Sequence, residues 1–512
     1  MSSQSHVVHY APGHTSPTHN ASFTQVAQDL TPLTVVVLGA SGDLAKKKTY
    51  PALFGLYLRN LLPKNTIIYG YARSHMELND FKKRISSYLK GDESKKQEFL
   101  SMCFYHSGKY DEKASYDQFS EILKKSEEKW NSTSVNRLFY MAIPPSIFLE
   151  VSKGIHDSLI LKSGGWSRIV VEKPFGKDLD SSRHLVTSLK KLFMEKDLFR
   201  IDHYLGKEMV QNLMVLRFAN SVFEPLWNKQ HISSITITFK ENIGTEGRGG
   251  YFDEFGIIRD VMQNHLMQVL SLVAMEPPVS MSADDITNEK VRLLRCIQPV
   301  RLDETVFGQY LGNDKIPGYL DDEGVPKDSI TPTYAAAVFW VNNPRWRGMP
   351  FILKCGKALD ERKTEVRIQF KAPENFLFKD QDITRNELVM RIQPGEAVYL
   401  KLLTKKPGLE NTIEQTELDL SYKNRFENLD LPDAYERLIL DSIKGDHNLF
   451  VRDDELDIAW QIFTPLLEQM EKRHLKPEPY EFGSRGPKSA DELSKRFGFQ
   501  RSTGYKWPGT SK

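Results

Sequence analysis

The chain has 512 residues, of which 40% are hydrophobic and 27% are charged, an ordinary composition for a globular protein of two or three domains. Its 69 Lys and Arg residues nearly balance its 67 Asp and Glu residues, so the formal net charge is only +2. That balance excludes a general electrostatic preference for nucleic acid or for an anionic membrane. No run approaches the ~18 apolar residues of a transmembrane helix, so we expect neither nucleic acid nor membrane as a partner.

The cysteines and the first residues indicate a reducing compartment. Cys103, Cys296 and Cys355 are far apart and lack the short spacings of zinc ligands, so we expect reduced thiols, no disulfide and no structural metal. Residues 1–32 are rich in Ser, Thr and Pro, contain no Lys or Arg, and lack the apolar run of a signal peptide. They predict a disordered tail and a cytoplasmic protein, with metal chelation by the tail histidines as the alternative.

A glycine-containing turn follows the first predicted strand. Residues 33–38 form a short apolar run, typical of a parallel strand buried on both faces, and residues 46–58 can form a helix. Between them, the turn lets a pyrophosphate approach the helix N-terminus. Its spacing departs from strict G-x-G-x-x-G, and alone it is weak evidence for a nucleotide. The candidate cofactor-binding residues in this turn are Gly39, Ala40, Ser41, Gly42, Asp43, Leu44 and Ala45.

A second predicted strand, residues 66–71, ends close to Arg73 rather than to an acidic residue. In a dinucleotide-binding fold an acidic side chain there binds the ribose 2′-hydroxyl, whereas arginine accommodates a 2′-phosphate. Arg73 therefore favours NADP over NAD, unless it is only a surface residue. Strands and helices keep alternating to residue 176, which predicts a doubly wound parallel sheet with ligands at its carboxyl edge. Lys173 lies at that edge; the alternative is that Pro174 merely ends a strand.

Residues 200–212 carry more chemistry than packing requires. An acid, an imidazole and a phenol (Asp202, His203 and Tyr204) precede Lys207, after which an apolar helical run begins. If the helix starts at Lys207, its backbone donors would join the ammonium in holding a phosphate. If it starts earlier, His203 and Lys207 would share a helix face. Both geometries predict an anion-binding site, and a helix start that only caps and solvates stays open as the alternative.

Further along, residues 232–240 alternate apolar and polar side chains, the period of a strand with one buried face, and Glu241 follows. Residues 253–276 are predicted to form one helix that ends at a Pro-Pro pair. His265 falls on the apolar stripe of this helix, where a structural core histidine is the common case. The helix alone therefore does not indicate a site.

The later part of the chain is predicted to be rich in strands. Five short runs between residues 335 and 403 follow one another closely, which indicates an antiparallel meander and makes this region α+β. A polar loop between two of the strands carries Lys357, Arg362 and Lys363. It is either a solvated turn or part of a site for an anion.

Five separated motifs together closely resemble the glucose-6-phosphate dehydrogenase family. They are GASGDLA at 39–45, EKPFG at 172–176, RIDHYLGKE at 200–208, RDVMQNH at 259–265 and CGKALDERK at 355–363. The resemblance runs from about residue 33 to near the C-terminus, which leaves 1–32 as a tail. It implies an α/β, Rossmann-type doubly wound NADP-binding domain at 33–202. A β+α substrate-binding and dimerisation domain with a large, mostly antiparallel sheet would follow at 203–512.

The resemblance also implies an activity and a set of site residues. The activity is oxidation of D-glucose 6-phosphate to 6-phospho-D-glucono-1,5-lactone by NADP, the first step of the oxidative pentose phosphate pathway, in a homodimer or homotetramer. His265 matches the family's general base and Asp202 the carboxylate that orients it; no metal is implied, since the cofactor accepts the hydride. Lys173 matches a lysine that contacts both substrate and cofactor. The substrate-binding matches are Lys173, His203, Tyr204, Lys207, Glu241, Asp260, Lys357 and Arg362.

Some features stay open even with the resemblance. Phe148 stands where some relatives carry a tyrosine near the cofactor, and Asp260 is expected off the helical face of His265. Some family members bind a second, structural NADP, but a basic sheet face without a ligand is the alternative here. Two other functions compete with the main one: a dehydrogenase of unphosphorylated sugars, and a catalytically silent NADPH-binding scaffold. The residues that match the second NADP site are Lys363, Arg367, Arg391, Lys401, Arg485 and Trp507.

Overall fold

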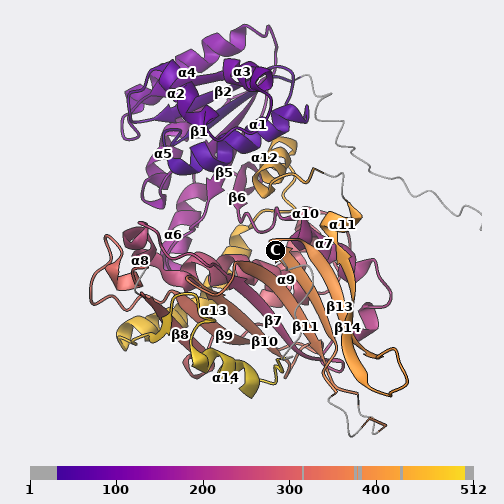
Figure 1. The fold of residues 1–512 in the computed structure, drawn as a ribbon. Coiled ribbons are helices and arrows are strands. Elements are labelled where there is room, and N and C mark those ends of the chain that lie inside the picture. Colours follow the sequence, from indigo (N-terminus) through magenta and orange to yellow (C-terminus); the bar gives the residue numbers. More distant parts are fainter. Residues whose placement is uncertain (1–30, 314–315, 374–376, 379–382, 427–429, 502–512) are drawn as a thin grey trace, which may run out of the picture.

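The first of two sheets is parallel throughout in the computed structural model, which describes residues 31–313, 316–373, 377–378, 383–426 and 430–501 (Figure 1). Its strand order is β3-β2-β1-β4-β5-β6, so the direction of strand addition reverses between β1 and β4. This confirms the predicted doubly wound sheet and places its switch point at the turn after β1. The six strands are β1 (Leu33–Leu38), β2 (Thr66–Ala72), β3 (Cys103–Ser107), β4 (Asn136–Met141), β5 (Ser167–Glu172) and β6 (Leu198–Ile201).

Helices cover both faces of this sheet, which explains the continuous apolar sequence of β1. Val35 and Val37 pack on one side with α1 (Tyr50–Leu58), whereas Val36 and Leu38 pack on the other with α4 (Lys113–Glu128). The remaining helical segments of this region are η2 (Ala45–Thr49), α2 (Leu78–Ser86), α3 (Glu93–Ser101), η3 (Pro145–Ile147), α5 (Phe148–Gly154), η4 (Ile155–Leu159), α6 (Leu179–Lys190) and η5 (Glu195–Asp197).

A helix from late in the chain also covers the first sheet. In α12 (Ala434–Lys444), Tyr435, Leu438 and Ile439 belong to the same apolar cluster as α1, and Figure 1 shows the two helices side by side. The predicted domain bounds, 33–202 and 203–512, did not anticipate this return of the chain; they stay a prediction. Of the predicted tail, residues 1–30 lie outside the described residues.

The second sheet has nine strands in the order β14-β13-β12-β11-β7-β10-β9-β8-β15. The predicted simple meander is wrong at one point, because β7 lies between β11 and β10 and runs parallel to β10. In that central position the polar face of β7 is covered as well, so Thr236 and Thr238 are buried. The nine strands of the second sheet are β7 (Ile232–Lys240), β8 (Thr305–Leu311), β9 (Tyr334–Trp340), β10 (Pro350–Gly356), β11 (Lys363–Phe370), β12 (Glu387–Gln393), β13 (Ala397–Lys405), β14 (Ile413–Ser421) and β15 (Glu478–Glu481).

The predicted single helix over residues 253–276 is wrong as well. The chain breaks at Gly256, whose φ of 66° is left-handed and which lies close to Thr331, so a glycine is suited to the turn. The result is α8 (Gly249–Ile257), the π-helical η7 (Ile258–Leu266) and α9 (Met267–Ala274). The other helical segments are α7 (Glu208–Phe218), η6 (Glu224–Leu226), α10 (Ala283–Leu294), η8 (Leu302–Glu304), η9 (Tyr319–Asp321), α11 (Tyr422–Arg425), α13 (Asp453–Lys472) and α14 (Lys488–Arg496).

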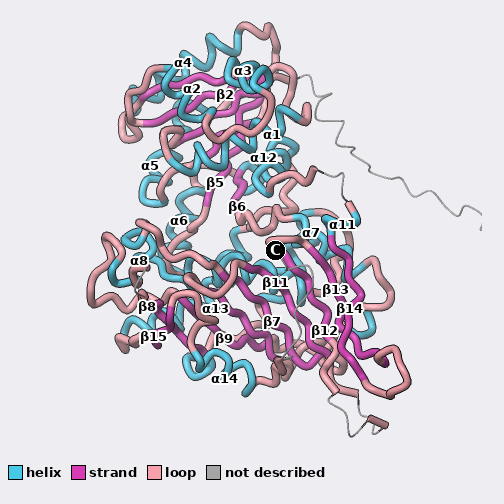
Figure 2. The backbone as a smooth tube through the Cα atoms, in the orientation of Figure 1, coloured by secondary structure: helices cyan, strands magenta, loops and turns pink. Residues whose placement is uncertain are grey.

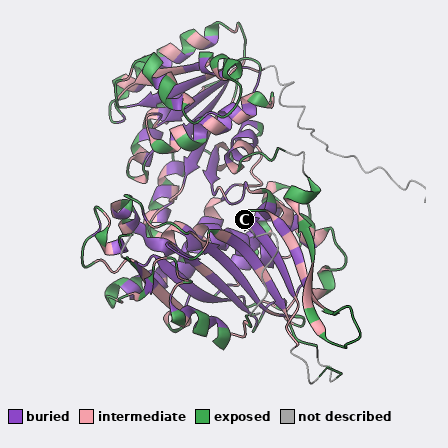
Figure 3. Cartoon of the chain, in the orientation of Figure 1, coloured by how far each residue is buried: buried purple, intermediate pink, exposed green. Residues whose placement is uncertain are grey.

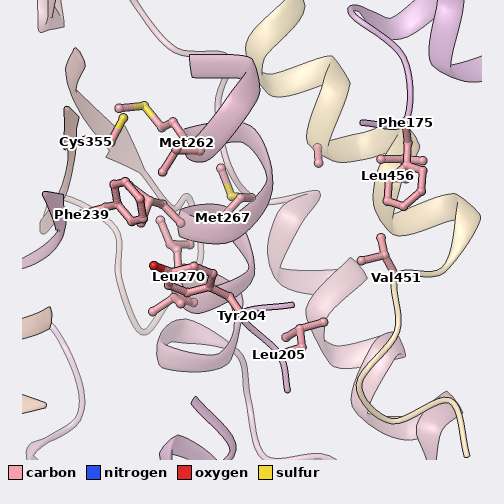
Figure 4. Close-up of a cluster of buried hydrophobic side chains, with 14 of the residues drawn as sticks. Phe175, Tyr204, Leu205, Phe239, Met262, Met267, Leu270, Cys355, Val451 and Leu456 are labelled. Atoms are coloured by element: carbon pink, nitrogen blue, oxygen red, sulfur yellow. The ribbon is translucent and has the colours of Figure 1, made fainter. Parts of the chain in front are cut away.

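The core of the second region lies between its sheet and η7 with α9. Figure 2 shows the curved sheet, and Figure 3 shows that its central strands are buried. In Figure 4, Phe239 of β7 and Cys355 of β10 lie beside Met262 and Met267, with Tyr204 below them. All three cysteines are free thiols. Within the described ranges, no helix combines the length and apolar character needed to cross a membrane.

Candidate active site

The site begins where β6 ends. Asp202 follows the last residue of that strand, and after a short turn Lys207 stands at the N-cap of α7, which starts at Glu208. Of the two geometries considered for this segment, the structure shows the helix beginning at Lys207. Lys207 therefore lies at the end of α7 that carries its free backbone donors and the positive end of its dipole.

Asp202 and His265 form a buried pair. His265 Nδ1 lies 2.5 Å from Asp202 Oδ1, and the side chains are 4% and 3% exposed. The amide of Tyr204 donates to the same carboxylate oxygen at 3.0 Å. Burial alone would raise the pKa of Asp202, but the imidazole and this amide outweigh burial and hold it below its ordinary value. Because the carboxylate accepts at Nδ1, the proton of the neutral imidazole resides there and Nε2 is left as a base.

Lys173 and Asp260 form a second pair next to the first. The Lys173 ammonium donates to Asp260 Oδ1 at 2.6 Å and to its backbone oxygen at 2.8 Å, and the Lys173–Pro174 peptide bond is cis. Burial would lower the pKa of Lys173, but Asp260 outweighs it and raises the pKa. Conversely, Lys173 and Lys357 overcome the effect of burial and lower the pKa of Asp260 to about 2. Both groups are therefore charged at neutral pH.

The π-helical geometry of η7 places Asp260 near His265. In an α-helix a residue five positions away points to another side, which is why Asp260 was expected off the His265 face. In a π-helix the hydrogen bonds close turns of five residues, so the two side chains come close to alignment. The two side chains are close enough that His265, when protonated, contributes to lowering the pKa of Asp260. That expectation is corrected, and η7 presents both groups to one cleft.

His203, Tyr204 and Lys207 gather on the other side of His265. The His203 ring meets His265 edge-on with centroids 4.6 Å apart, and Tyr204 stacks on His265 at 4.5 Å. Lys207 Nζ lies 5.1 Å from the Tyr204 ring centre. Burial and neighbouring cations hold the pKa of His203 well below its ordinary value, so its ring is neutral. Burial also lowers the pKa of Lys207, and Arg362 adds to this effect.

Several residues of this cluster had not been identified from the sequence. Lys48 of η2 is close enough to lower the pKa of both His203 and Lys207, and Tyr435 stacks on His203 at 5.8 Å. Gln393 donates to the Tyr204 hydroxyl at 2.8 Å. The run of three lysines after the glycine turn was a usable signal for Lys48. No local pattern points to Tyr435 or Gln393, because each lies nearly two hundred residues or more from its partner.

The remaining substrate-site candidates join the same cleft. Lys357 Nζ lies 2.5 Å from Glu241 Oε2, and the charge of Lys357 reaches Asp260. Arg362 is exposed, but its charge reaches Tyr204: burial raises the pKa of that phenol, and Arg362 opposes the rise. The structure thus brings together all eight residues that the resemblance indicated for the substrate, although they come from five separate stretches of chain.

The glycine turn lies at the carboxyl edge of the first sheet. Gly39 has a φ of 80°, and a Cβ there would stand 2.2 Å from the backbone oxygen of Ala142, so the position excludes other residues. The Gly39 amide donates to the Tyr71 oxygen at the end of β2, which brings the turn next to the stretch that carries Arg73. Arg73 is exposed, with its guanidinium 5.8 Å from the Tyr110 ring centre. Phe148 is fully buried in the core.

Two other features bear on ligands. Asp202, His203 and His265 present donor atoms within 4.8 Å of one another, but Asp202 and His265 are bonded to each other rather than turned toward a shared ion. The matches to a second NADP site partly line one cavity, where the cations meet carboxylates: Arg367 pairs with Glu365 and Glu387. Lys363, Lys401 and Arg485 line it as well, Arg391 donates to the Pro394 oxygen, and Trp507 lies outside the described residues. Binding of a dinucleotide there stays a prediction.

Glu172, next to Lys173, is a buried carboxyl that titrates unusually high. It accepts from the Tyr140 hydroxyl at 2.5 Å, and burial raises its pKa from 4.5 to about 7. Between pH 4.5 and about pH 7 the folded chain therefore keeps this proton, whereas the unfolded chain loses it. The free energy of unfolding falls as the pH rises through this range.

Glu172→Gln is expected to remove this pH dependence. Relative to the parent, the variant gains about 3 kcal/mol in free energy of unfolding between pH 4.5 and pH 8, from a shift of about 2.5 pKa units. Urea denaturation at both pH values measures the difference, with the exposed Glu492→Gln as the control. A gain that is equal at the two pH values would contradict the raised pKa of Glu172.

Comparison with known proteins agrees with the geometry. Residues 36–212 match the family model for the NAD binding domain of glucose-6-phosphate dehydrogenase, and residues 214–508 match that for its C-terminal domain. The chain belongs to the glucose-6-phosphate dehydrogenase family. The resemblance drawn from five motifs is thereby confirmed, and it extends over both sheets.

Individual members of the glucose-6-phosphate dehydrogenase family are close to this chain. Glucose-6-phosphate 1-dehydrogenase of Dictyostelium discoideum is 80% identical over 482 residues, which cover 94% of this chain and 97% of that protein. Glucose-6-phosphate 1-dehydrogenase 6, cytoplasmic, of Arabidopsis thaliana is 51% identical over 485 residues, 93% of each chain. A solved structure of glucose-6-phosphate dehydrogenase in complex with its substrate glucose-6-phosphate is 47% identical. It superimposes with a TM-score of 0.88, covering 92% of this chain and 99% of that one.

Proposed function

We propose that the chain oxidises D-glucose 6-phosphate to 6-phospho-D-glucono-1,5-lactone and reduces NADP, the first step of the oxidative pentose phosphate pathway. The observation that carries the proposal is the buried His265–Asp202 pair beside a group of cations, in a member of this family. Relatives that bear the name of this activity, at 80% and 51% identity, support it.

In this proposal His265 is the general base and Asp202 orients it. Nε2 of His265 accepts the proton of the C1 hydroxyl while hydride leaves the same carbon. Asp202 holds the Nδ1 proton, fixes the ring and stabilises the imidazolium that forms. Bound NADP supplies the hydride acceptor. The glycine turn at the switch point and the exposed guanidinium of Arg73 fit a phosphorylated dinucleotide, because they offer a close backbone approach and a cation.

The other residues hold the sugar in place. Neutral His203, the Tyr204 hydroxyl and the Lys207 ammonium bind the 6-phosphate, and the N-terminus of α7 adds backbone donors. Lys173, Asp260, Glu241 and Lys357, joined by short ion pairs, offer both donors and acceptors to the ring hydroxyls. Arg362 extends the positive charge at the rim. Anchoring the distant phosphate fixes C1 against His265, so these contacts serve rate as well as affinity.

The assembly and the location are part of the proposal. We infer a homodimer or homotetramer that forms through the second sheet, whose outermost strand β14 leaves Leu418 66% and Leu420 41% exposed. The cytoplasmic relative from Arabidopsis supports a cytoplasmic location. Size-exclusion chromatography with light scattering tests the first inference, since a monomer would overturn it.

Turnover of glucose 6-phosphate, compared with free glucose and followed by NADPH absorbance, tests the function. Fast turnover with the phosphorylated sugar alone supports the proposal. Comparable turnover of free glucose would instead support a dehydrogenase of unphosphorylated sugars. Binding of NADPH without any turnover would support the silent scaffold.

Arg73→Ala is expected to reduce the preference for NADP over NAD by about tenfold, through a rise in KM for NADP alone. The exposed guanidinium loses its contact with the 2′-phosphate, a group that NAD lacks. The ratio of kcat/KM values for the two cofactors measures the effect, with Arg292→Ala, an exposed arginine on α10, as the control. An equal loss with both cofactors would contradict this role for Arg73.

A further inference from the structure

The two carboxylate oxygens of Asp202 are in different situations. Oδ1 accepts from His265 Nδ1 and from the Tyr204 amide, whereas Oδ2 is fully buried and has no partner among the described residues. A buried anionic oxygen without a donor is costly, so native structures supply one from the protein or from ordered water.

A small cavity adjoins this carboxylate. Asp202 and Gln268 line it, together with polar side chains of η7 (Arg259, Gln263 and Asn264) and the ammonium-bearing Lys173. The rest is an apolar wall formed by Pro174 and Phe175, Ile201 of β6, Val451 before α13, and Leu456, Ala459 and Trp460 on α13. Figure 4 shows three members of that wall, Phe175, Val451 and Leu456, lying together. The space open to the centre of a water molecule is about 20 Å³, above the ~10–15 Å³ that one water needs.

The amide nitrogen of Gln268 already has a hydrogen-bond partner, whereas its amide oxygen has none within the part of the chain that the structure describes. Gln268 is 5% exposed, and its Nε2 donates to Glu455 Oε1 at 2.7 Å. Glu455 is completely buried and also pairs with Lys290 at 2.7 Å, so it is a charged acceptor that fixes the orientation of the amide. Gln268 Oε1 is left buried and without a partner in the described chain. Gln268 Oε1 and Asp202 Oδ2 both accept, so only a molecule with two donors can satisfy both.

We propose that this cavity holds one water molecule, which donates to Asp202 Oδ2 and to Gln268 Oε1, and that Gln268 is thereby a positioning residue for the His265–Asp202 pair. Lys290 and Glu455 hold the Gln268 amide in place, and Gln268 Oε1 in turn holds the water. The water then holds the Asp202 carboxylate. Both oxygens of Asp202 are then held, and the carboxylate cannot rotate away from the imidazole.

The water also shares the negative charge of Asp202. Without it, the carboxylate is a stronger acceptor for the Nδ1 proton of His265 and favours the imidazolium more. The acid limb of the kcat profile then moves to higher pH. The other titratable groups that face the pair stay unchanged in the variants below: Glu172 and Lys173 after β5, His203, Tyr204 and Lys207 after β6, Asp260 on η7, Lys357 after β10 and Tyr435 on α12.

Gln268→Met in the full-length chain tests the role, because methionine keeps the approximate shape and removes both the donor and the acceptor of the amide. We expect kcat to fall about tenfold, the rate equivalent of one hydrogen bond, with KM for both substrates within about twofold. The acid limb should move to higher pH. Gln461→Met, an exposed glutamine on α13, is the matched control and should behave like the parent.

Ala459→Val is the second variant. Ala459 lines the cavity, and the added methyl groups take the volume of the water while Gln268 stays in place. It should reproduce the lower kcat and the shifted limb. It also provides the test if Gln268→Met, which leaves Glu455 with one partner fewer, fails to fold.

The kinetic test of the water depends on the proposed function, whereas a test by high-resolution crystallography does not. The parent should show density within hydrogen-bonding distance of both Asp202 Oδ2 and Gln268 Oε1, and both variants should lack it. Absence of that density in the parent overturns the proposal even if the enzyme is active. A lower kcat with an unmoved acid limb also overturns it. A parent that shows the density but does not oxidise glucose 6-phosphate refutes the activity, not the water.

Discussion

His265→Ala is expected to lower kcat for glucose 6-phosphate by about 10²–10⁴-fold, the usual contribution of a positioned general base. The imidazole has no replacement, because Asp202 is turned toward Nδ1 and its free oxygen is buried on the far side. KM for the sugar phosphate should change little, since His203, Tyr204 and Lys207 remain. Initial rates of NADPH formation measure the effect, and fluorescence titration with NADPH verifies that the cofactor still binds.

The control for this experiment is His156→Ala. His156 lies on η4 with 37% of its side chain exposed and pairs with Asp157, away from the cleft, so its loss should leave the rate unchanged. If His265→Ala retained the parent rate, the assignment of the base would be wrong even though the geometry of the pair is intact. If His156→Ala also lost activity, the loss would reflect folding and not chemistry.

His265 illustrates what local sequence can and cannot predict. Its place on an apolar stripe favoured a structural histidine, and it is indeed buried. Its partner Asp202 lies 63 residues away, so no periodicity connects them. Only the family resemblance paired the two residues in advance. The π-helical turn that brings Asp260 beside them also has no signature in the spacing of apolar residues.

In the fold, too, local sequence predicted some features and missed others. Continuous apolar runs predicted β1 and β2 well, because a strand buried on both faces must be apolar throughout. The insertion of β7 between β10 and β11 was missed, because strand pairing between distant segments leaves no local pattern. The packing of α12 on α1 was missed for the same reason. The break at Gly256 had a local cue, a glycine within a helical pattern, which the apolar periodicity obscured.

Lys207→Ala is expected to lower kcat/KM for glucose 6-phosphate by about a hundredfold, while the slow reaction with free glucose stays within about twofold. A charge-assisted bond to phosphate in a largely buried setting is worth about 2–3 kcal/mol, and each ~1.4 kcal/mol is a factor of ten. Lys207 is placed for this bond by its N-cap position, and the neighbouring charges of Lys48 and Arg362 leave it poised for an anion.

The comparison of the two sugars separates recognition from chemistry. Loss of the phosphate contact removes the anchor that fixes C1, so part of the effect should appear in kcat and part in KM. Lys95→Ala, on the exposed face of α3, controls for a general loss of positive charge. Equal losses of kcat/KM with both sugars would instead indicate that Lys207 maintains the structure of the site. Since free glucose lacks only the phosphate, a loss confined to the phosphorylated sugar assigns the ammonium to that group, and with it the orientation of the substrate relative to His265.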